Sequence, residues 1–568
     1  MMSALKRYDW KSFRKAFILS FFLALGVGIT LAGVHLRGNT LEGLLFYARV
    51  PMSDGSTQSV NRCLAFCVPA AIHLFVIAVL ASYIIILNKS AVIKKIGKTP
   101  VKQIYYIYRH YVLTSIALVI ASSMFFGSQI DAFSYFKDFM QKTEVYNKEY
   151  TDPERQVYEF PEKKKNLIYI FLESMESSFA SVAEGGLMPD NYIPYLTELA
   201  KENVSFSDTD VLGGAHSVAG TTWTAAAMVT QTSGIPLTIP ISKSNFGKDN
   251  SFLPGAYSIG EILEDAGYNQ ELMVGSIASY AKREAYFVEH GNYRIFDYYT
   301  AEERMLIPKD YFRWWGFEDQ KLFEYAKSEI TNLYNEGKPF NFTMLTVDTH
   351  FTDGYLCEQC EYNYDNQYAN VIRCSDKQIH NFIEWIKQQP FYEDTVIVLA
   401  GDHITMDHNY FNRIDEEVMK RGRRIYNCFI NTGLNPDQRT EKNRDFSTLD
   451  MFPTTLAALG VKWGSSSLGL GVNLFSDMPT LCERKGVDGL SNELASSSDF
   501  YSNYIIDYQT PETDSTLGEE ADIKYAEKYR EAEQKRRQEE LEKRLLESQI
   551  QSDASELPAD QQQTPVSE

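Results

Sequence analysis

Cysteine is scarce in this chain: 7 thiols are spread over 568 residues, which excludes a small fold held together by disulfides. Basic residues are outnumbered, with 55 Lys and Arg against 75 Asp and Glu and a formal net charge of -20. No local basic stripe interrupts this balance, which argues against a nucleic-acid partner. Disorder of the whole chain is also excluded, because 44% of the residues are hydrophobic and can bury a large core.

Three runs near the N-terminus lack Lys, Arg, Asp and Glu altogether: residues 16–36, 68–87 and 111–130. Each is about 20 residues long, which as a helix matches a hydrocarbon core of about 30 Å. A signal peptide is the alternative for the first run, but that run has no clear small-x-small cleavage site and two more runs follow. The sequence therefore predicts three transmembrane helices within a membrane domain of residues 1–130.

Basic residues flanking the three runs predict the orientation. Eleven precede the first run or lie between the second and third, and three lie between the first and second. Because basic loops stay in the cytoplasm, we expect a cytoplasmic N-terminus and an extracytoplasmic chain after Ile130. The eleven are Lys6, Arg7, Lys11, Arg14, Lys15, Lys89, Lys94, Lys95, Lys98, Lys102 and Arg109, and the three are Arg37, Arg49 and Arg62.

We expect the rest of the chain to consist of four parts. These are a linker (131–165), a large domain (166–480), a C-terminal extension (481–516) and a charged helix followed by a disordered tail (517–568). In the large domain, apolar runs alternate with amphipathic segments, which predicts an α/β fold with a mainly parallel central sheet covered by helices on both faces. Strands are expected at 166–174, 204–208, 270–276, 340–350 and 394–403, and helices at 192–202, 259–266, 320–335 and 375–388.

Reactive side chains follow several of the expected strands. Glu173, His350 and the pair Asp402 and His403 stand at strand ends, and a small-residue segment around Thr222 leads into a helix. Taken singly, Glu173 fits a helix start, Asp402 a turn and Thr222 an N-cap. Carboxyl ends of parallel strands meet at one edge of a sheet. Together, these oxygen and nitrogen donors would suit Zn²⁺ or Mn²⁺ there.

An ordered set of motifs over residues 160–475 resembles the lipoteichoic acid synthase and phosphoglycerol transferase family, a branch of the alkaline phosphatase and sulfatase superfamily. The pattern is nearest to the members that decorate periplasmic glucans. The resemblance implies a sulfatase-like, alkaline-phosphatase-like catalytic domain and one divalent metal ion, Mn or Zn with Mg also possible. The motifs are NLIYIFLES, GTTWTAAAM followed by SGIPL, TVDTHFTDG, and GDH with TLDMFPTTLAALG and LGLGVNLF.

Carried over residue by residue, the resemblance implies that the metal ligands are Glu173, Thr222, Asp402 and His403. Thr222 would also be the nucleophile that forms a phosphothreonine, and its neighbour Thr221 is the alternative. His350 would donate a proton or contact phosphate on the acceptor or leaving-group side. Arg283 would bind a phosphodiester, although the family has a tryptophan near this arginine where this chain has Ala281 and Lys282.

Three further features stay open at this stage. His408 either supports a second metal or is an exposed loop histidine, and His216 is equally ambiguous. The pair Cys357 and Cys360 is expected to form a short disulfide if it lies outside the cytoplasm, with Cys374, Cys428 and Cys482 unassigned. The charged helix near the C-terminus is either a solvated helix or a coiled-coil partner segment.

The resemblance implies a bacterial inner-membrane enzyme that moves phosphoglycerol from phosphatidylglycerol to a glycan or another envelope acceptor. Ordinary sulfatase activity is disfavoured, because no C/S-x-P-x-R segment surrounds Thr222. A phosphoethanolamine transferase acting on lipid or glycan is the second hypothesis. The third is a membrane sensor or scaffold that has kept the fold and lost catalysis.

Overall fold

The structure is a computed structural model that describes residues 10–37, 41, 43–45, 57–87, 110–239, 251–434 and 441–508. The charged segment 517–549 and the tail that follows it lie outside the described residues, so both hypotheses for that segment remain untested.

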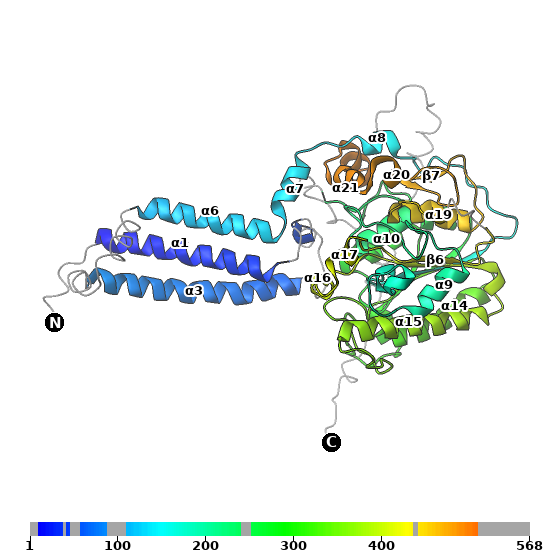
Figure 1. The fold of residues 1–568 in the computed structure, drawn as a ribbon, viewed down its shortest axis with the longest axis horizontal. Helices are drawn as coiled ribbons and strands as arrows, with labels where there is room; N and C mark the ends of the chain where they lie inside the picture. The colour runs from blue at the N-terminus through cyan, green and yellow to red at the C-terminus, as the bar shows by residue number, and fades with distance from the viewer. Residues whose placement is uncertain are drawn as a thin grey trace, which may run out of the picture. The chain divides into compact units, whose positions relative to one another are not determined.

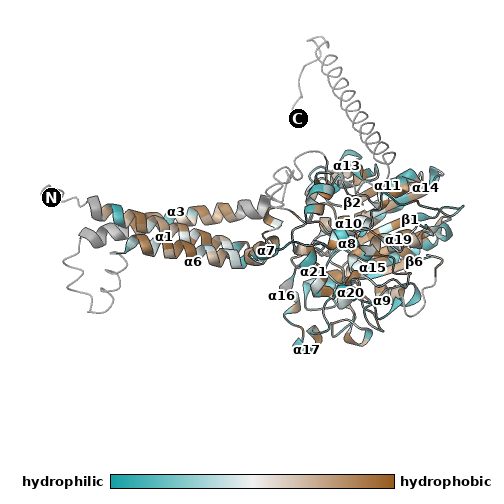
Figure 2. Cartoon of the chain, turned by 90° about the horizontal axis from the view of Figure 1, so that it is seen from above, coloured by the Kyte–Doolittle hydropathy of each residue, from teal (hydrophilic) through white to brown (hydrophobic). Residues whose placement is uncertain are grey.

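Three long apolar helices occupy the N-terminal part of the chain: α1 (Trp10–His35), α3 (Thr57–Leu87) and α6 (Tyr111–Gln129). In Figure 2 most residues of these helices that carry a hydropathy colour are hydrophobic. Helix α1 packs against both α3 and α6 (Figure 1). A Cβ atom at Gly33 would lie only 3.1 Å from the Cα atom of Phe126 on α6, so glycine permits this close approach of the two helices.

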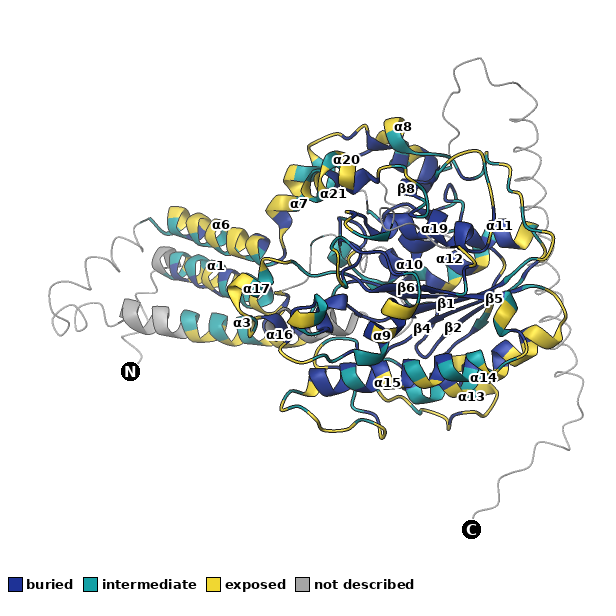
Figure 3. Cartoon of the chain, turned by 45° about the vertical axis from the view of Figure 1, so that its right-hand side comes forward, coloured by how far each residue is buried: buried dark blue, intermediate teal, exposed yellow. Residues whose placement is uncertain are grey.

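Large apolar side chains on these helices are exposed, among them Phe21 (48%) and Leu113 (67%) (Figure 3). Such faces cost free energy in water and suit contact with lipid. Within the described residues, two segments are long and apolar enough to cross a bilayer, Phe13–His35 and Tyr111–Gln129. The described apolar part of α3, Cys63–Val79, is shorter. The predicted span 68–87 lies in a helix, and its crossing of the bilayer stays a prediction.

A six-stranded sheet forms the centre of the following domain, with the strand order β3-β2-β4-β1-β5-β6. All neighbours pair in parallel except β6, which runs antiparallel to β5 at one edge. The strands are β1 (Asn166–Leu172), β2 (Asn269–Val274), β3 (Arg294–Phe296), β4 (Phe340–Leu345), β5 (Thr395–Gly401) and β6 (Asn427–Ile430).

Both faces of the sheet are buried, as the alternation of side chains along β1 shows. Tyr169 and Phe171 belong to one core cluster, and Ile168 and Ile170 belong to the other. Figure 3 shows the sheet between the two helical layers. The helices of one layer are α10 (Thr224–Ser233), α11 (Ile259–Asp265), α12 (Arg283–Glu289) and α19 (Met451–Ala458). The helices of the other layer are α9 (Pro194–Glu202), α13 (Tyr298–Glu303), α14 (Asp319–Asn335) and α15 (Gln367–Lys387). The predicted fold class is confirmed.

Most expected elements appear, with three differences. Residues 204–208 are not a strand, because Val204 makes only an isolated bridge to Phe429. The short strands β3 and β6 were not predicted, and α15 begins at Gln367 rather than near residue 375. Apart from short 3-10 helices, the other elements among the described residues are α7 (Ala132–Phe139), α8 (Val145–Glu149), α16 (His408–Phe411), α17 (Glu416–Met419), β7 (Ser467–Leu468), β8 (Gly471–Val472), α20 (Leu481–Lys485), α21 (Val487–Ala495) and a π-helical turn (Tyr501–Ile506).

Segments on both sides of the predicted catalytic domain contribute to its core. Tyr146 of α8 stacks on Phe500 with 5.7 Å between ring centroids, and both pack in the cluster that contains Phe171. The N–H of Gly255 donates to the carbonyl of Ile505 at 3.0 Å, which fastens the π-helical turn to the domain. The boundaries at residues 166 and 480 therefore stay predictions, while the observed core extends past both.

Candidate active site

Glu173 and Asp402 are brought together by the register of two neighbouring strands. Strands β1 and β5 pair in parallel with Leu172 opposite Gly401, so the next residue of each strand lies at the same edge of the sheet. His403 follows Asp402, and its Nε2 lies 3.6 Å from Glu173 Oε1 and 3.4 Å from Asp402 Oδ2. All three side chains are buried. The structure thus clusters three of the four predicted metal ligands.

Main-chain groups hold these side chains in place. Asp402 Oδ1 accepts hydrogen bonds from the N–H groups of Ser174 and His403, both at 2.7 Å. Ser174 Oγ donates to Glu173 Oε1 at 2.8 Å. The Nδ1 atom of His403 lies 2.8 Å from the carbonyl oxygen of Ile404, so Nδ1 carries the proton and donates it. The lone pair of Nε2 is therefore free to face the carboxylates.

The electrostatics of the cluster fit a divalent cation. Burial and the nearby charge of Glu173 raise the pKa of Asp402 to about 8. Burial opposes ionisation of Glu173 as well, but His350 and His403 outweigh it and leave the pKa of Glu173 below its ordinary value. Asp402 Oδ2 is buried and has no hydrogen-bond partner among the residues that the structure describes. Two adjacent carboxylates, one with an unused oxygen, and an imidazole nitrogen match the donor set of Zn²⁺ or Mn²⁺.

The threonine that reaches this cluster is Thr224, not Thr222. Thr224 Oγ1 donates to Glu173 Oε2 at 3.2 Å and lies 3.4 Å from His403 Nε2. Thr222 is exposed, and no hydrogen bond joins it to Glu173, Asp402 or His403 within the described part of the chain. The physical reason is the turn before α10: Gly220 has φ of +76°. The next residue, Thr221, is buried and donates to the carbonyl of Val218 at 2.9 Å.

Arg283 lies buried at the start of α12, with its guanidinium fixed by three acceptors. Its Nη2 donates to Ser276 Oγ at 3.0 Å and to the carbonyl of Ile277 at 2.7 Å, and its Nε donates to the carbonyl of Tyr280 at 3.1 Å. Burial lowers the pKa of Arg283, and the charge of Glu173 acts in the opposite direction. The arginine is therefore a fixed cation within electrostatic range of the acidic cluster.

His350 follows β4 and faces the same group of charges. Burial lowers its pKa, and the charges of His403 and Arg283 lower it further, against the attraction of Glu173. Its Nδ1 lies 2.7 Å from the carbonyl oxygen of Phe351 and donates to it. With the proton on Nδ1, Nε2 of the neutral imidazole carries a lone pair, which suits a group that takes and returns a proton.

The structure brings a tryptophan from a distant part of the sequence to the Tyr280 ring, which the guanidinium of Arg283 also faces. Trp315, from the loop between α13 and α14, lies 4.7 Å from the ring of His350 and 5.9 Å from the ring of Tyr280, centroid to centroid. The guanidinium of Arg283 lies 5.7 Å from the centre of the Tyr280 ring. Sequence reasoning missed Trp315, and the only signal for it was the WW pair at 314–315.

The remaining candidates lie apart from this cluster or outside the described side chains. His216 Nε2 is paired with Asp445 Oδ1 at 2.8 Å, and Asp208 lies close to both. The side chain of His408 is not among those described. Cys357 and Cys360 form no disulfide in this structure, since their sulfur atoms are 3.6 Å apart; the expected bond is absent.

Comparison with known proteins agrees with this architecture. The profile of the sulfatase family matches residues 165–461. The phosphoglycerol transferase I of Escherichia coli O127:H6 is 32% identical over 334 residues, which cover 57% of this chain and 40% of that protein. The phosphoglycerol transferase I of Salmonella arizonae is 33% identical with the same coverage. The matched stretch thus spans about 40% of the length of these curated relatives.

Among solved structures, the lipoteichoic acid synthase of Listeria monocytogenes has 19% sequence identity and a TM-score of 0.43, and the alignment covers 56% of this chain and 77% of that one. The family profile spans more than half of the chain, and its match agrees with the parallel sheet and with the motifs at its strand ends. The chain belongs to the sulfatase family.

Proposed function

We propose that this protein is a membrane-anchored phosphotransferase that moves phosphoglycerol from phosphatidylglycerol to a glycan or another acceptor of the bacterial envelope. The observation that carries this proposal is the contact of the Thr224 hydroxyl with Glu173 and His403. A hydroxyl at a buried metal-ligand cluster, with a fixed arginine and a neutral histidine nearby, is suited to phosphoryl transfer through a covalent intermediate. The name of the relatives, phosphoglycerol transferase I, supports the choice of transferred group.

The chain's own residues divide the reaction into two displacements. In the first, Thr224 Oγ1 attacks phosphorus, an O–P bond to Thr224 forms, and the O–P bond to diacylglycerol breaks. The Thr224 proton leaves along its hydrogen bond to Glu173 Oε2 and ends on the departing alcohol. A divalent cation held by Glu173, Asp402 and His403 would lower the pKa of the hydroxyl and offset phosphate charge.

In the second displacement, His350 accepts the proton of the acceptor hydroxyl, which attacks the phosphothreonine. The O–P bond to Thr224 breaks, and the proton returns to Thr224 Oγ1. Arg283 would bind the non-bridging oxygens in both steps, because its guanidinium is held in one orientation by Ser276 and Ile277. Residues 166–480 would form the catalytic domain, placed outside the cytoplasm beside its lipid donor by the N-terminal helices.

The test uses the full-length protein in detergent with Mn²⁺ or Zn²⁺ and phosphatidylglycerol, followed by peptide mass spectrometry. Phosphoglycerol should add about 154 mass units to Thr224, whereas phosphoethanolamine supplied from phosphatidylethanolamine would add about 123. Thr224→Ala should lower transfer by about a thousandfold or more, and the matched variant Thr222→Ala should stay within a few-fold of the parent.

An adduct on Thr222 together with an active Thr224→Ala protein would overturn the assignment of the nucleophile. An adduct formed only from phosphatidylethanolamine would support the phosphoethanolamine transferase. Absence of any adduct and of any transfer in the presence of metal would favour the sensor or scaffold.

A further inference from the structure

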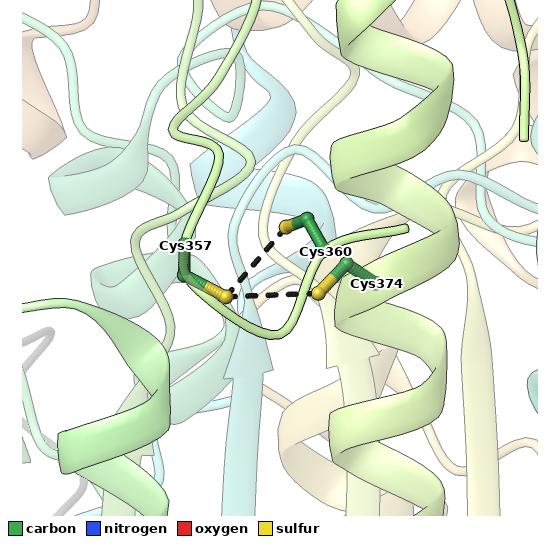
Figure 4. Close-up of side chains that lie close together, drawn as sticks. All are labelled: Cys357, Cys360 and Cys374. Carbon is green, nitrogen blue, oxygen red and sulfur yellow. Dashed lines mark hydrogen bonds between the residues drawn. The ribbon is translucent and has the colours of Figure 1, made fainter. Parts of the chain in front are cut away.

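Three cysteine side chains meet on the side of the domain that carries α15. Cys357 and Cys360 lie in the loop between β4 and α15, and Cys374 lies within α15. The sulfur of Cys357 is 3.6 Å from that of Cys360 and 3.7 Å from that of Cys374. Figure 4 shows the three sulfur atoms pointing toward one another. Each of the three can offer a ligand atom to one common position.

The spacing of these sulfurs matches coordination to zinc. Tetrahedral zinc binds thiolates at about 2.3 Å, which places neighbouring sulfurs about 3.8 Å apart. A disulfide needs a sulfur separation of about 2.05 Å and joins only two of the three thiols. The C-x-x-C pair also forms a tight turn, in which the N–H of Cys360 donates to the carbonyl of Cys357 at 3.1 Å.

The surroundings favour a thiolate at Cys357 only. Hydrogen bonds from Cys360 and Cys374 lower the pKa of Cys357 to about 3, and the N–H groups of Gln359 and Cys360 contribute in the same direction. The hydrogen bonds that Cys360 and Cys374 make to Cys357, together with burial, raise the pKa of Cys360 to about 12 and raise the pKa of Cys374 as well, so a bound zinc ion would displace their two protons. The side-chain amide of Gln378 on α15 donates to the sulfurs of Cys374 and Cys357, at 3.6 and 3.8 Å. Cys357 and Cys374 are buried and Cys360 is half-buried, so solvent reaches the set on the side of Cys360.

We propose that Cys357, Cys360 and Cys374 bind one zinc ion as thiolates, at a site separate from Glu173, Asp402 and His403. A water molecule would fill the fourth position of the tetrahedron. The ion would fasten the loop 351–366 to α15. Because this loop follows His350 directly, the zinc site would have a positioning role for that histidine and no part in the chemistry.

Cobalt substitution tests this site in the full-length protein. The protein is purified in detergent with its thiols reduced, its metal is exchanged for Co²⁺, and the absorption spectrum is recorded. We expect thiolate-to-cobalt charge-transfer absorption in the near ultraviolet, which a site made of Glu173, Asp402 and His403 cannot produce because it has no sulfur. Cys357→Ser and Cys374→Ser should each abolish this absorption, and the control Cys482→Ala should retain it.

A second measurement does not depend on the folding of a variant. In the parent protein loaded with Zn²⁺, Cys360 should resist alkylation by iodoacetamide and become reactive after a chelator removes the metal. Absence of the charge-transfer band in the reduced parent protein would overturn the proposal. Equal alkylation of Cys360 with and without zinc would also overturn it, as would a disulfide from Cys357 as the main species in protein purified without a reductant.

Discussion

The two histidines of the candidate site use their ring nitrogens in the same way. His403 and His350 each donate the Nδ1 proton to the carbonyl of the following residue, Ile404 and Phe351. This bond fixes the tautomer and turns Nε2 toward the reacting groups. Both rings are therefore oriented by the local main chain, and their orientation needs no third side chain.

Asp402→Asn provides a residue-scale test of metal binding. The amide oxygen can still accept the two main-chain hydrogen bonds made to Oδ1, while the repulsion between Asp402 and Glu173 is removed. Without metal, the variant should unfold at the same temperature as the parent or a higher one. Addition of Mn²⁺, which prefers oxygen and nitrogen ligands to thiolates, at about 100 times the dissociation constant should stabilise the parent by about 2.7 kcal/mol and the variant far less, as measured by thermal unfolding.

A parent protein that gains no stability from Mn²⁺ would contradict binding of this ion by Glu173, Asp402 and His403. An equal gain in the variant would show that Asp402 is not a ligand.

His290 predicts a pH dependence of stability. Burial opposes its charge, but Glu261, whose Oε1 lies 3.3 Å from Nδ1, and then Glu289 raise its pKa from 6.5 to about 9. A raised pKa contributes stability that is complete below pH 6.5 and is lost as the pH rises through about 9. The shift corresponds to about 3 kcal/mol.

The check is the difference in free energy of unfolding between the parent and His290→Gln, measured between pH 6 and pH 10. The difference should be largest at pH 6 and should shrink toward pH 10. A difference that is constant or that grows with pH would contradict the assignment.

Single residues also show where sequence reasoning reached its limit. Glu173, Asp402 and His403 could be predicted because they follow strands whose apolar runs are easy to recognise. Thr224 could not, because the direction of each hydroxyl depends on the turn at Gly220 and Thr221, which sequence spacing does not set. Trp315 was missed because it approaches His350 from a separate loop.

At the scale of elements, the sequence predicted the long, fully buried strands and missed the short ones. The runs that became β1, β4 and β5 were predicted because every residue in them is buried. Strands β3 and β6 have three and four residues, too few for a periodicity to emerge. Helix α15 starts early because Asn366 caps it, its side chain accepting from the N–H of Ala369 at 3.1 Å, a signal that lies outside the amphipathic pattern.

The docking of the π-helical turn (Tyr501–Ile506) provides an element-scale prediction. A Cβ atom at Gly255 would lie 1.9 Å from the carbonyl oxygen of Tyr504, so Gly255→Ala must displace the main chain of that turn. We expect a loss of about 1–3 kcal/mol in the free energy of unfolding, as for other overpacked sites, measured by chemical denaturation.

The matched control for this change is Gly489→Ala in α21. There the nearest atom to the added Cβ lies 4.0 Å away, and the higher helix propensity of alanine should stabilise the protein by up to about 1 kcal/mol. Equal effects of the two substitutions would contradict the docking argument.

At the scale of the whole molecule, the core reaches from the segment before β1 to the π-helical turn. Every described residue of the core lies before residue 509. A chain that ends after Tyr508 should therefore keep the thermal unfolding temperature of the parent. A chain that ends after Pro479 should fail to fold, because it loses Leu490, Tyr501 and Ile505 from the core.

Circular dichroism and size-exclusion chromatography in detergent distinguish the two truncated chains. A folded protein that ends at Pro479 would place the boundary of the catalytic domain near residue 480, as the sequence predicted.

The pairing of β1 with β5 has a consequence for biogenesis. Ser174 and Asp402, which share a hydrogen bond beside the cluster, are 228 positions apart along the chain. The proposed cation site at Glu173, Asp402 and His403 therefore forms only after both strands have been synthesised and have paired in register. If the proposed cation binds there, its retention would indicate that the two strands have paired correctly, and a chain with misaligned strands would bind no cation at this site.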